Sequence, residues 1–446
     1  MDILAKEGVL FTDAFAQATW TRPSGASMLS STYPSVHGVN GLYDALPAYV
    51  PVVPEYLKRA GFRTIAISSM GNISPHFGFG KGFDVFIELY KDKNIAEKRR
   101  KVLLQNQQWE PHFKGDEGRD WVPITTSEDI NEFTLSLLKT GGTEDVFIFI
   151  WSLDTHGPYF HRDMRLAYFY PDDVIWVTED VAKAKSDVEI DRLMRLYEDM
   201  IYYNDYHLGA LIEKLKLLGL YDEALLIVTG DHGEAFGEHG FNSHGREPYD
   251  ELIRVPLIMK FPFSKYHGEV SSIVQHIDIV PTIIDYLSVP KDDMMLQGKS
   301  AMPLLREKAR INEYAFTEHR PSSQYPGYIS LRSQDYKCLA VRRKEVTFWQ
   351  WLKERNRLWP SPWFIYKPMF LYDLRKDPGE RLNLIHEEID ESQRFQSRIK
   401  TILKANEKVA QTLKKKKGLG EGFDAKEVKK VDDEVSRQLK TLGYFD

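Results

Sequence analysis

Cysteine is nearly absent from this chain of 446 residues, which contains only Cys338. No disulfide can therefore form within the chain, and this agrees with a reducing compartment such as the cytoplasm. Long apolar runs are lacking too: none approaches the roughly 18 residues that a membrane-spanning helix needs, and no apolar signal-peptide core stands at the start. We therefore expect no transmembrane segment and a cytoplasmic location, with an upstream signal left open.

An excess of positive charge is also missing. The formal net charge is −6 and the isoelectric point is near 6.2, whereas nucleic-acid-binding domains usually carry a basic face. Hydrophobic residues make up 42% of the chain, which at this length is enough for a large core and two domains. The composition thus favours a globular protein with no nucleic-acid partner, and it leaves the oligomeric state open.

The densest group of chemically active side chains follows a short apolar run at residues 224–229. The run is typical of a strand buried on both faces, and ligands bind at the carboxyl ends of strands in open α/β sheets. Asp231 and His232 follow it in a glycine-rich loop, as an oxygen and a nitrogen donor suited to a divalent cation. The alternative is an ordinary turn with a capping aspartate and a solvated histidine.

Residues 229–244 and 249–258 together resemble the sulfatase family of the alkaline phosphatase superfamily. In that family an Asp-His pair ligates the catalytic metal, and a downstream Lys or His contacts the sulfate or phosphate. The resemblance therefore implies that Asp231 and His232 are metal ligands and that His244 is the downstream group. It extends over nearly the whole chain.

The segment Thr21-Arg22-Pro23-Ser24-Gly25 stands at the nucleophile position that the resemblance implies. Its proline marks a helix N-terminus, where an anion binds well. Sulfatases carry a Cys or Ser there that becomes formylglycine, with an Arg after the Pro-Ser, whereas this chain has Thr21 and Gly25. We expect no formylglycine, because phosphoester-cleaving relatives use an unmodified Thr or Ser. A helix N-cap role for Thr21 and a fallback nucleophile at Ser24 stay open.

A second predicted strand, residues 146–151, leads to Asp154 and His156. We also expect this strand to be buried on both faces. The resembling proteins have a His before Pro-Tyr that contacts the ester oxygen or the leaving group, which implies that role for His156. Imidazole titrates near neutrality, so His156 is the candidate general acid or oxyanion-binding group, with Asp154 orienting it. A structural histidine in a loop is the alternative.

The first residues of the chain concern the number of ligands in the predicted metal site. Residues 1–11 predict a helical turn, a glycine and a strand, and in the resembling family this segment follows a first strand whose paired aspartates complete the metal site. An Asp-His pair supplies fewer than the roughly six donors that calcium or manganese takes. We expect either a gene start placed at an internal Met or a protein that has lost half of its site. The expected metal is calcium, or manganese or zinc in a phosphoesterase.

The predicted architecture has two domains. Residues 1–308 form a sulfatase-like catalytic domain around a doubly wound, mostly parallel α/β sheet, without its first strand. Residues 309–446 form a small α+β domain on an antiparallel sheet, with a hairpin at 328–342, a third strand at 370–374 and a charged helix at 388–415. A charged stretch at 91–128 predicts an insertion or lid, and an aromatic insertion at 348–370 predicts packing on the sheet.

The expected function is metal-dependent hydrolysis of a sulfate or phosphate ester, with a small molecule or a glycan as the substrate. Thr21 attacks, Asp231 and His232 hold the metal, and His156 and His244 bind the anion and assist the leaving group. Two alternatives stay open: a phosphotransferase of the same superfamily, and a catalytically inactive member that binds an anionic ligand.

Overall fold

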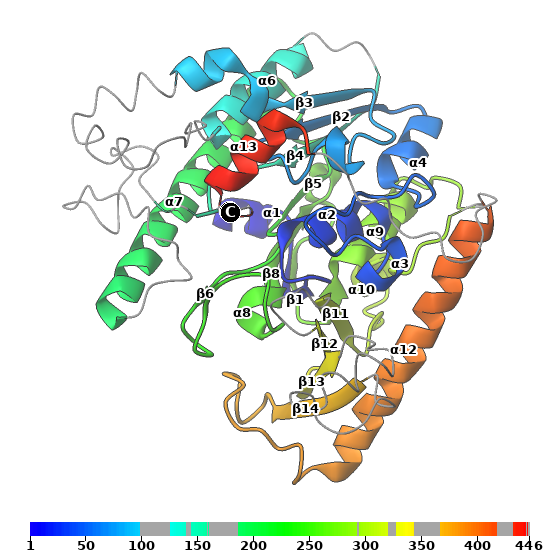
Figure 1. Cartoon of the computed structure of the whole chain (residues 1–446). Coiled ribbons are helices and arrows are strands. Elements are labelled where there is room, and N and C mark those ends of the chain that lie inside the picture. Colours follow the sequence, from blue (N-terminus) through cyan, green and yellow to red (C-terminus); the bar gives the residue numbers. More distant parts are fainter. Residues whose placement is uncertain are drawn as a thin grey trace.

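The structure is a computed structural model that describes residues 1–98, 125–139, 144–157, 159, 186–291, 294–319, 327–342, 366–416, 431–442 and 444. Most of the predicted insertions at 91–128 and 348–370 lie outside these residues. Figure 1 shows a larger main unit above a smaller sheet unit, with α12 running along the side of both. Among the described helices, none has the length and apolar character needed to cross a membrane.

Two sheets form the centre of the main unit. The mixed sheet has the order β10-β1-β8-β5, with β9 also paired to β1, and comprises β1 (Val9–Phe15), β5 (Leu226–Thr229), β8 (Arg254–Lys260), β9 (Gly268–Val270) and β10 (Val274–Gln275). Strand β8 is antiparallel to both β1 and β5. The second sheet is parallel, in the order β3 (Val85–Glu88), β2 (Arg63–Ser68), β4 (Val146–Trp151). A short ribbon of β6 (Ala235–Phe236) and β7 (Asn242–Ser243) lies in the loop after β5.

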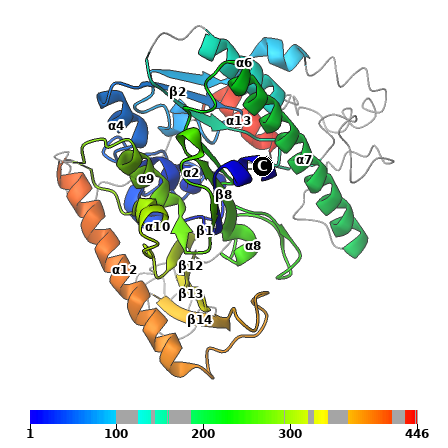
Figure 2. The same cartoon turned by 180° about the vertical axis from the view of Figure 1, so that it is seen from behind.

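Helices cover these sheets (Figure 2). They are α1 (Asp2–Glu7), α2 (Thr21–Ser30), α3 (Pro34–His37), α4 (Val53–Arg59), α6 (Ser127–Lys139), α7 (Asp187–Leu217), α8 (Asp250–Ile253), α9 (Ile279–Tyr286) and α10 (Met302–Arg306). Short 3-10 turns are η1 (Pro75–Phe77), η2 (Leu89–Lys91), η5 (Pro262–Ser264) and η6 (His276–Asp278). Every residue of α2 is buried, so this helix runs through the core and presents its first residue to the site.

Strands β4 and β5 differ from their prediction. All of β5 and the first five residues of β4 are only partly buried, whereas the sequence predicted burial on both faces. Within the described residues, β5 pairs only with β8 and β4 only with β2. The apolar runs therefore mark strands correctly, but they do not mark interior strands of one continuous sheet.

The smaller unit is an antiparallel sheet in the order β11 (Ala315–His319), β12 (Gly327–Arg332), β13 (Tyr336–Arg342), β14 (Tyr366–Asp373). Helix α12 (Ile389–Lys416) packs on β14 and on α3 of the main unit. The predicted hairpin, third strand and charged helix are confirmed, and so is the α/β class with a separate antiparallel sheet. The sequence missed β11, whose polar Thr317, Glu318 and His319 are nevertheless buried.

The last helix, α13 (Asp433–Thr441), returns to the main unit. Its Val435 and Leu439 belong to the same apolar core as β1 and β8. Both views show α13 lying against the main unit (Figures 1 and 2). The domain boundary at residue 308 stays a prediction, and α13 packs within the larger of the two predicted domains.

A buried ionic cluster joins the units next to the loop after β5. Lys337 on β13 is wholly buried, and its Nζ lies 2.8 Å from an Asp250 carboxylate oxygen and 2.6 Å from a Glu380 oxygen. Arg332 Nε lies 3.0 Å from the second Asp250 oxygen. Removing one partner of such a cluster typically costs about 3–5 kcal/mol, because a buried charge is left without compensation. The small sheet thereby steadies α8 and the loop before it.

Candidate active site

Three chain segments converge on one small cavity: the start of α2, the loop after β4 and the loop after β5. The cavity has a volume of about 50 Å³, and Thr21, His156, Asp231 and His232 are among its lining residues. The ring centroid of His244 lies 4.5 Å from that of His232 and 5.3 Å from that of His156. All five residues that the sequence singled out therefore lie together, as expected for loops leaving strand ends in this fold class.

Thr21 is the first residue of α2 and is almost wholly buried. The helix N-cap is Trp20, so the alternative N-cap role for Thr21 is wrong. The Thr21 hydroxyl instead faces the cavity, where Oγ1 lies 3.3 Å from His232 Nε2 and 3.2 Å from the hydroxyl of Tyr444. This position places the hydroxyl at the positive end of the helix dipole, where an anion is stabilised.

Ser24, the fallback nucleophile, makes hydrogen bonds that connect two segments of the site. Its hydroxyl donates to the carbonyl oxygen of Asp231 at 2.6 Å and also lies 3.4 Å from His276 Nδ1. Ser24 thereby ties α2 to the loop after β5. Thr21 is the hydroxyl of the pair that lines the cavity.

His156 and His232 are held in the same tautomer. Nδ1 of His156 lies 2.6 Å from the Gly157 carbonyl oxygen, and Nδ1 of His232 lies 2.7 Å from the Gly233 carbonyl oxygen. Since a carbonyl oxygen can only accept, each Nδ1 carries a proton. Burial lowers the pKa of His156 to about 4 and also lowers the pKa of His232, so both rings are neutral near pH 7. Each Nε2 therefore turns a lone pair toward the cavity.

The pKa of His244 is shifted in the opposite direction from those of His156 and His232. Burial alone would lower its pKa, but the Glu234 carboxylate, with its oxygens 3.1 and 3.3 Å from Nδ1, raises the pKa of His244 above its ordinary value. The Tyr159 hydroxyl donates to Glu234 at 2.8 Å and fixes the carboxylate in place. The raised pKa favours the protonated form of His244, and its Nε2 lies on the cavity side, near the Tyr444 hydroxyl. Glu234 lies in the predicted loop, but the sequence carried no sign that it would face His244.

The predicted role of Asp154 is not what the geometry supports. Its carboxylate accepts a hydrogen bond from the Ser127 backbone N–H at 2.8 Å and lies 3.4 Å from Asn204 Nδ2. Asp154 therefore joins the loop after β4 to α6 and α7. The orientation of His156 comes from the Gly157 carbonyl instead.

The donor set for a divalent metal is incomplete in the described residues. Asp231 Oδ2 lies 3.3 Å from His232 Nε2, so two electron-rich atoms converge as they would around a cation. Yet the described part of the chain contains no group of three or more His, Cys, Asp or Glu side chains that could hold a metal ion. Calcium takes about 6–8 oxygen ligands, and two side chains do not supply them. These residues by themselves do not fit a resident metal.

Gly25 and Arg22 lie close to Thr21 on the same helix. A Cβ atom on Gly25 would lie 2.7 Å from Ile73 Cδ1 and 3.2 Å from the Trp151 ring, so a longer side chain has no room there. Arg22 is buried with its guanidinium 3.4 Å from the Phe77 ring centroid. Burial lowers the pKa of Arg22 to about 9, which still leaves a cation near neutral pH beside the site.

Tyr444 is a further residue of the site that no sequence pattern indicated. Its hydroxyl lies 3.0 Å from His156 Nε2 and 3.2 Å from Thr21 Oγ1. It comes from the last few residues of the chain, 423 positions after Thr21. No motif or periodicity in the sequence connects these two segments.

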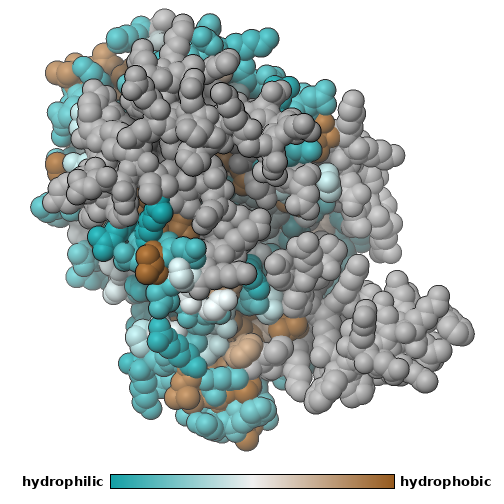
Figure 3. All heavy atoms as spheres, turned by 60° about the vertical axis from the view of Figure 1, so that its left-hand side comes forward, coloured by the Kyte–Doolittle hydropathy of each residue, from teal (hydrophilic) through white to brown (hydrophobic). Residues whose placement is uncertain are grey.

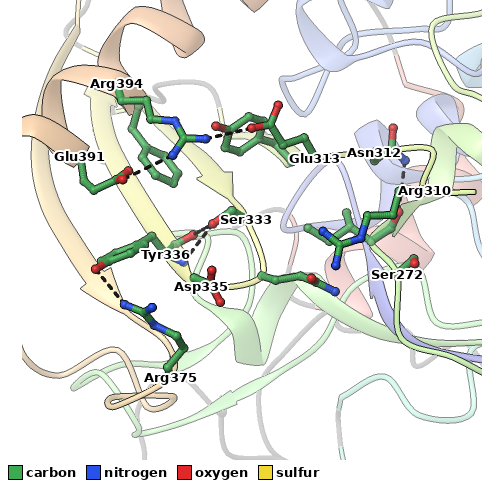
Figure 4. Close-up of a pocket in the computed structure, with 14 residues that line it drawn as sticks. Ser272, Arg310, Asn312, Glu313, Ser333, Asp335, Tyr336, Arg375, Glu391 and Arg394 are labelled. Carbon is green, nitrogen blue, oxygen red and sulfur yellow. Dashed lines mark hydrogen bonds and ion pairs between the residues drawn. The ribbon is translucent and has the colours of Figure 1, made fainter.

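A larger cavity, of about 470 Å³, lies elsewhere, at the junction of the two units (Figure 4). Its charged side chains are largely occupied with one another: Arg394 bonds Glu313 and Glu391, and Arg375 bonds the Tyr336 hydroxyl. None of the predicted site residues lines it. On the face shown in Figure 3, the described surface is mainly hydrophilic with scattered apolar residues. We therefore place the candidate site at the smaller cavity, because the side chains suited to catalysis line that cavity and not the larger one.

Comparison with known proteins identifies the family and the fold. Residues 1–289 match the family described as Sulfatase, and residues 237–356 match the one described as N-sulphoglucosamine sulphohydrolase, C-terminal. An N-acetylglucosamine-6-O-sulfatase of Bacteroides thetaiotaomicron is 22% identical, covering 86% of this chain and 77% of that protein. An ulvan-active sulfatase of Formosa agariphila is 24% identical, covering 86% and 71%. The phosphonate monoester hydrolase of Agrobacterium radiobacter shares the fold with a TM-score of 0.66 at 20% identity, covering 91% of this chain and 90% of that one.

Proposed function

The chain belongs to the sulfatase family, and we propose that it hydrolyses phosphate or sulfate esters with Thr21 as the nucleophile. The observation that carries the proposal is the Thr21 hydroxyl at the start of buried α2, 3.3 Å from the unprotonated Nε2 of His232. A hydroxyl is a weak nucleophile until a base takes its proton, and His232 is placed to do so.

In the first step the Thr21 oxygen attacks the phosphorus or sulfur atom, and the bond to the ester oxygen breaks. The Thr21 proton passes to His232 Nε2. The cationic His244 donates its Nε2 proton to the departing oxygen, while the N-terminus of α2 stabilises the charge on the transferred group. The product of this step is a covalent ester on Thr21.

In the second step water attacks the covalent ester. His156 Nε2 carries a lone pair, so His156 serves as the base that takes the water proton; this differs from the general-acid role expected from the sequence. The Thr21 oxygen leaves with the proton that His232 holds, and the proton on His156 restores His244. Asp231 and His232 alone do not fit a metal ion, so the two steps above are written with side chains of the described residues only.

We further propose that phosphate esters are cleaved faster than sulfate esters. A formylglycine hydrate has a second hydroxyl that expels sulfate, and threonine has none, so water must attack the intermediate. Phosphoryl transfer suits this route, since positioned cations and a helix N-terminus stabilise the charge on the transferred oxygens. By analogy with the sulfatases matched above, the substrate class is a small-molecule or glycan ester.

The test compares nitrophenyl phosphate, bis-nitrophenyl phosphate and nitrophenyl sulfate, each with calcium, manganese, zinc or chelator. We expect phosphate turnover that Thr21→Ala abolishes and Ser24→Ala largely retains, because Ser24 does not line the cavity. An added alcohol distinguishes transfer from hydrolysis by the product formed. Sulfate turnover above both phosphate activities, or activity that survives in Thr21→Ala, contradicts the proposal.

A further inference from the structure

We propose that Tyr444, from the C-terminal tail, occupies the place of the reacting ester group and competes with the substrate for it. The inference rests on the proposed function, because it assigns the ester to the same cavity. Its consequence is that the chain carries its own occupant of the active site, which must leave before an ester can bind.

The contacts of one phenol oxygen carry this inference. The Tyr444 hydroxyl lies 3.2 Å from Thr21 Oγ1, 3.0 Å from His156 Nε2 and 3.5 Å from His244 Nε2. Nε2 of His156 accepts the phenol proton, because Nδ1 of the same ring donates to the Gly157 carbonyl, and Nε2 of His244 faces the same phenol oxygen. The nucleophile, the base of the second step and the proton donor of the first step thus all face one atom, where an oxygen of a transferred phosphoryl group would lie.

The ring of Tyr444 is held as firmly as its hydroxyl. Its centroid lies 6.5 Å from that of Trp20, 5.6 Å from that of His156 and 6.3 Å from that of His244. Aromatic rings at such separations attract one another beyond simple burial. Burial also raises the pKa of Tyr444 above its ordinary value, so the phenol stays neutral and keeps its proton.

The space left beside Tyr444 is too small for a substrate. The cavity that remains measures about 50 Å³. Pockets that bind small molecules usually measure roughly 300–1,000 Å³. An ester group and Tyr444 therefore exclude each other from the site.

Helix α13 delivers the tyrosine. Val435 and Leu439 anchor the helix in the main core, and Gln438 Nε2 donates to the Ser69 carbonyl oxygen at 2.7 Å. Such anchoring keeps Tyr444 at a high effective concentration near the cavity. The Tyr444 backbone N–H also donates to the Leu439 carbonyl oxygen at 2.9 Å, and alanine at position 444 keeps that bond together with the anchors of the helix.

Calorimetric titration with inorganic phosphate tests the proposal without requiring turnover. If the tail is docked in about 90% of molecules, it lowers the apparent affinity about tenfold. We therefore expect Tyr444→Ala, and a chain that ends at Leu442, to bind phosphate at least about tenfold more tightly than the wild type. Lys440→Ala is the matched control, because Lys440 is an exposed residue of the same helix and should leave the affinity unchanged.

Thermal unfolding of each variant separates loss of the occupant from loss of the fold. Unchanged or weaker phosphate binding by folded Tyr444→Ala overturns the proposal, and weaker binding would make Tyr444 a direct ligand of the anion. Absence of phosphate binding in every variant also overturns it. Tighter binding by Tyr444→Ala without ester turnover would leave this proposal standing and reject the proposed hydrolysis.

Discussion

Replacing Glu234 by glutamine tests whether the positive charge of His244 serves the reaction. The Glu234 side chain is only 8% exposed, and its two carboxylate oxygens contact His244 Nδ1 and the Tyr159 hydroxyl. Glutamine keeps the shape and one acceptor but removes the negative charge. Burial then lowers the pKa of His244 with only the Asp231 charge to oppose it, so a smaller fraction of the ring is protonated near pH 7.

The magnitude follows from the interaction that is lost. A hydrogen bond to a charged group contributes about 1.5–3 kcal/mol, and each 1.4 kcal/mol is a factor of ten. We therefore expect kcat/KM for nitrophenyl phosphate to fall roughly 10- to 100-fold in Glu234→Gln. Little of this is lost to solvent screening, because the pair is buried.

The assay compares kcat/KM for the wild type, Glu234→Gln and Glu238→Gln. Glu238 is an exposed residue of the same loop, so its replacement controls for a general change of charge. An unfolding curve for each protein checks that the fold is retained. If folded Glu234→Gln keeps the kcat/KM of the wild type, the charge of His244 has no part in catalysis and the reasoning fails.

Three further predictions concern metal binding and stability. Calorimetry should find that calcium binds Asp231 and His232 only weakly, with a Kd on the order of millimolar, and a micromolar Kd would contradict the donor count. Burial raises the pKa of Asp278 to about 6. The folded chain then keeps this proton to a higher pH than the unfolded chain, so the free energy of unfolding should fall by about 3 kcal/mol as the pH rises from about 3 to about 7. Asp278→Asn should remove that slope, and denaturant curves with the same slope for both proteins would refute it. Gly25→Ala should lower the free energy of unfolding by about 1–3 kcal/mol, because the added Cβ would lie 2.7 Å from Ile73 Cδ1. Equal stability of the two proteins in denaturant would show that the Ile73 side chain can move aside, and it would refute this prediction.

The sequence predicted the parts of the site that lie within short segments. Asp231, His232 and His244 share one loop, and the apolar run before them marks a strand. Thr21 and His156 were placed by family resemblance, and the convergence of these segments follows from the general geometry of α/β sheets.

Other features depend on tertiary packing that local patterns do not contain. Glu234 acquires its role only because the loop folds back on itself and brings His244 beside it. Tyr444 reaches the cavity through the docking of α13, whose contacts include the hydrogen bond from Gln438 to Ser69. Strand β11 was missed because buried Thr317 and Glu318 are polar, and they obtain their hydrogen bonds from distant backbone groups.

The central claim is that Thr21 accepts the phosphoryl group, and trapping the covalent ester tests it most directly. His156→Gln should slow the attack of water, so the intermediate should accumulate when this variant is mixed with nitrophenyl phosphate and quenched in acid. Peptide mass spectrometry is predicted to find one phosphoryl group on Thr21, and an unmodified threonine at that position before substrate is added. A phosphoryl group on any other residue, or turnover with no label at Thr21, would contradict the account.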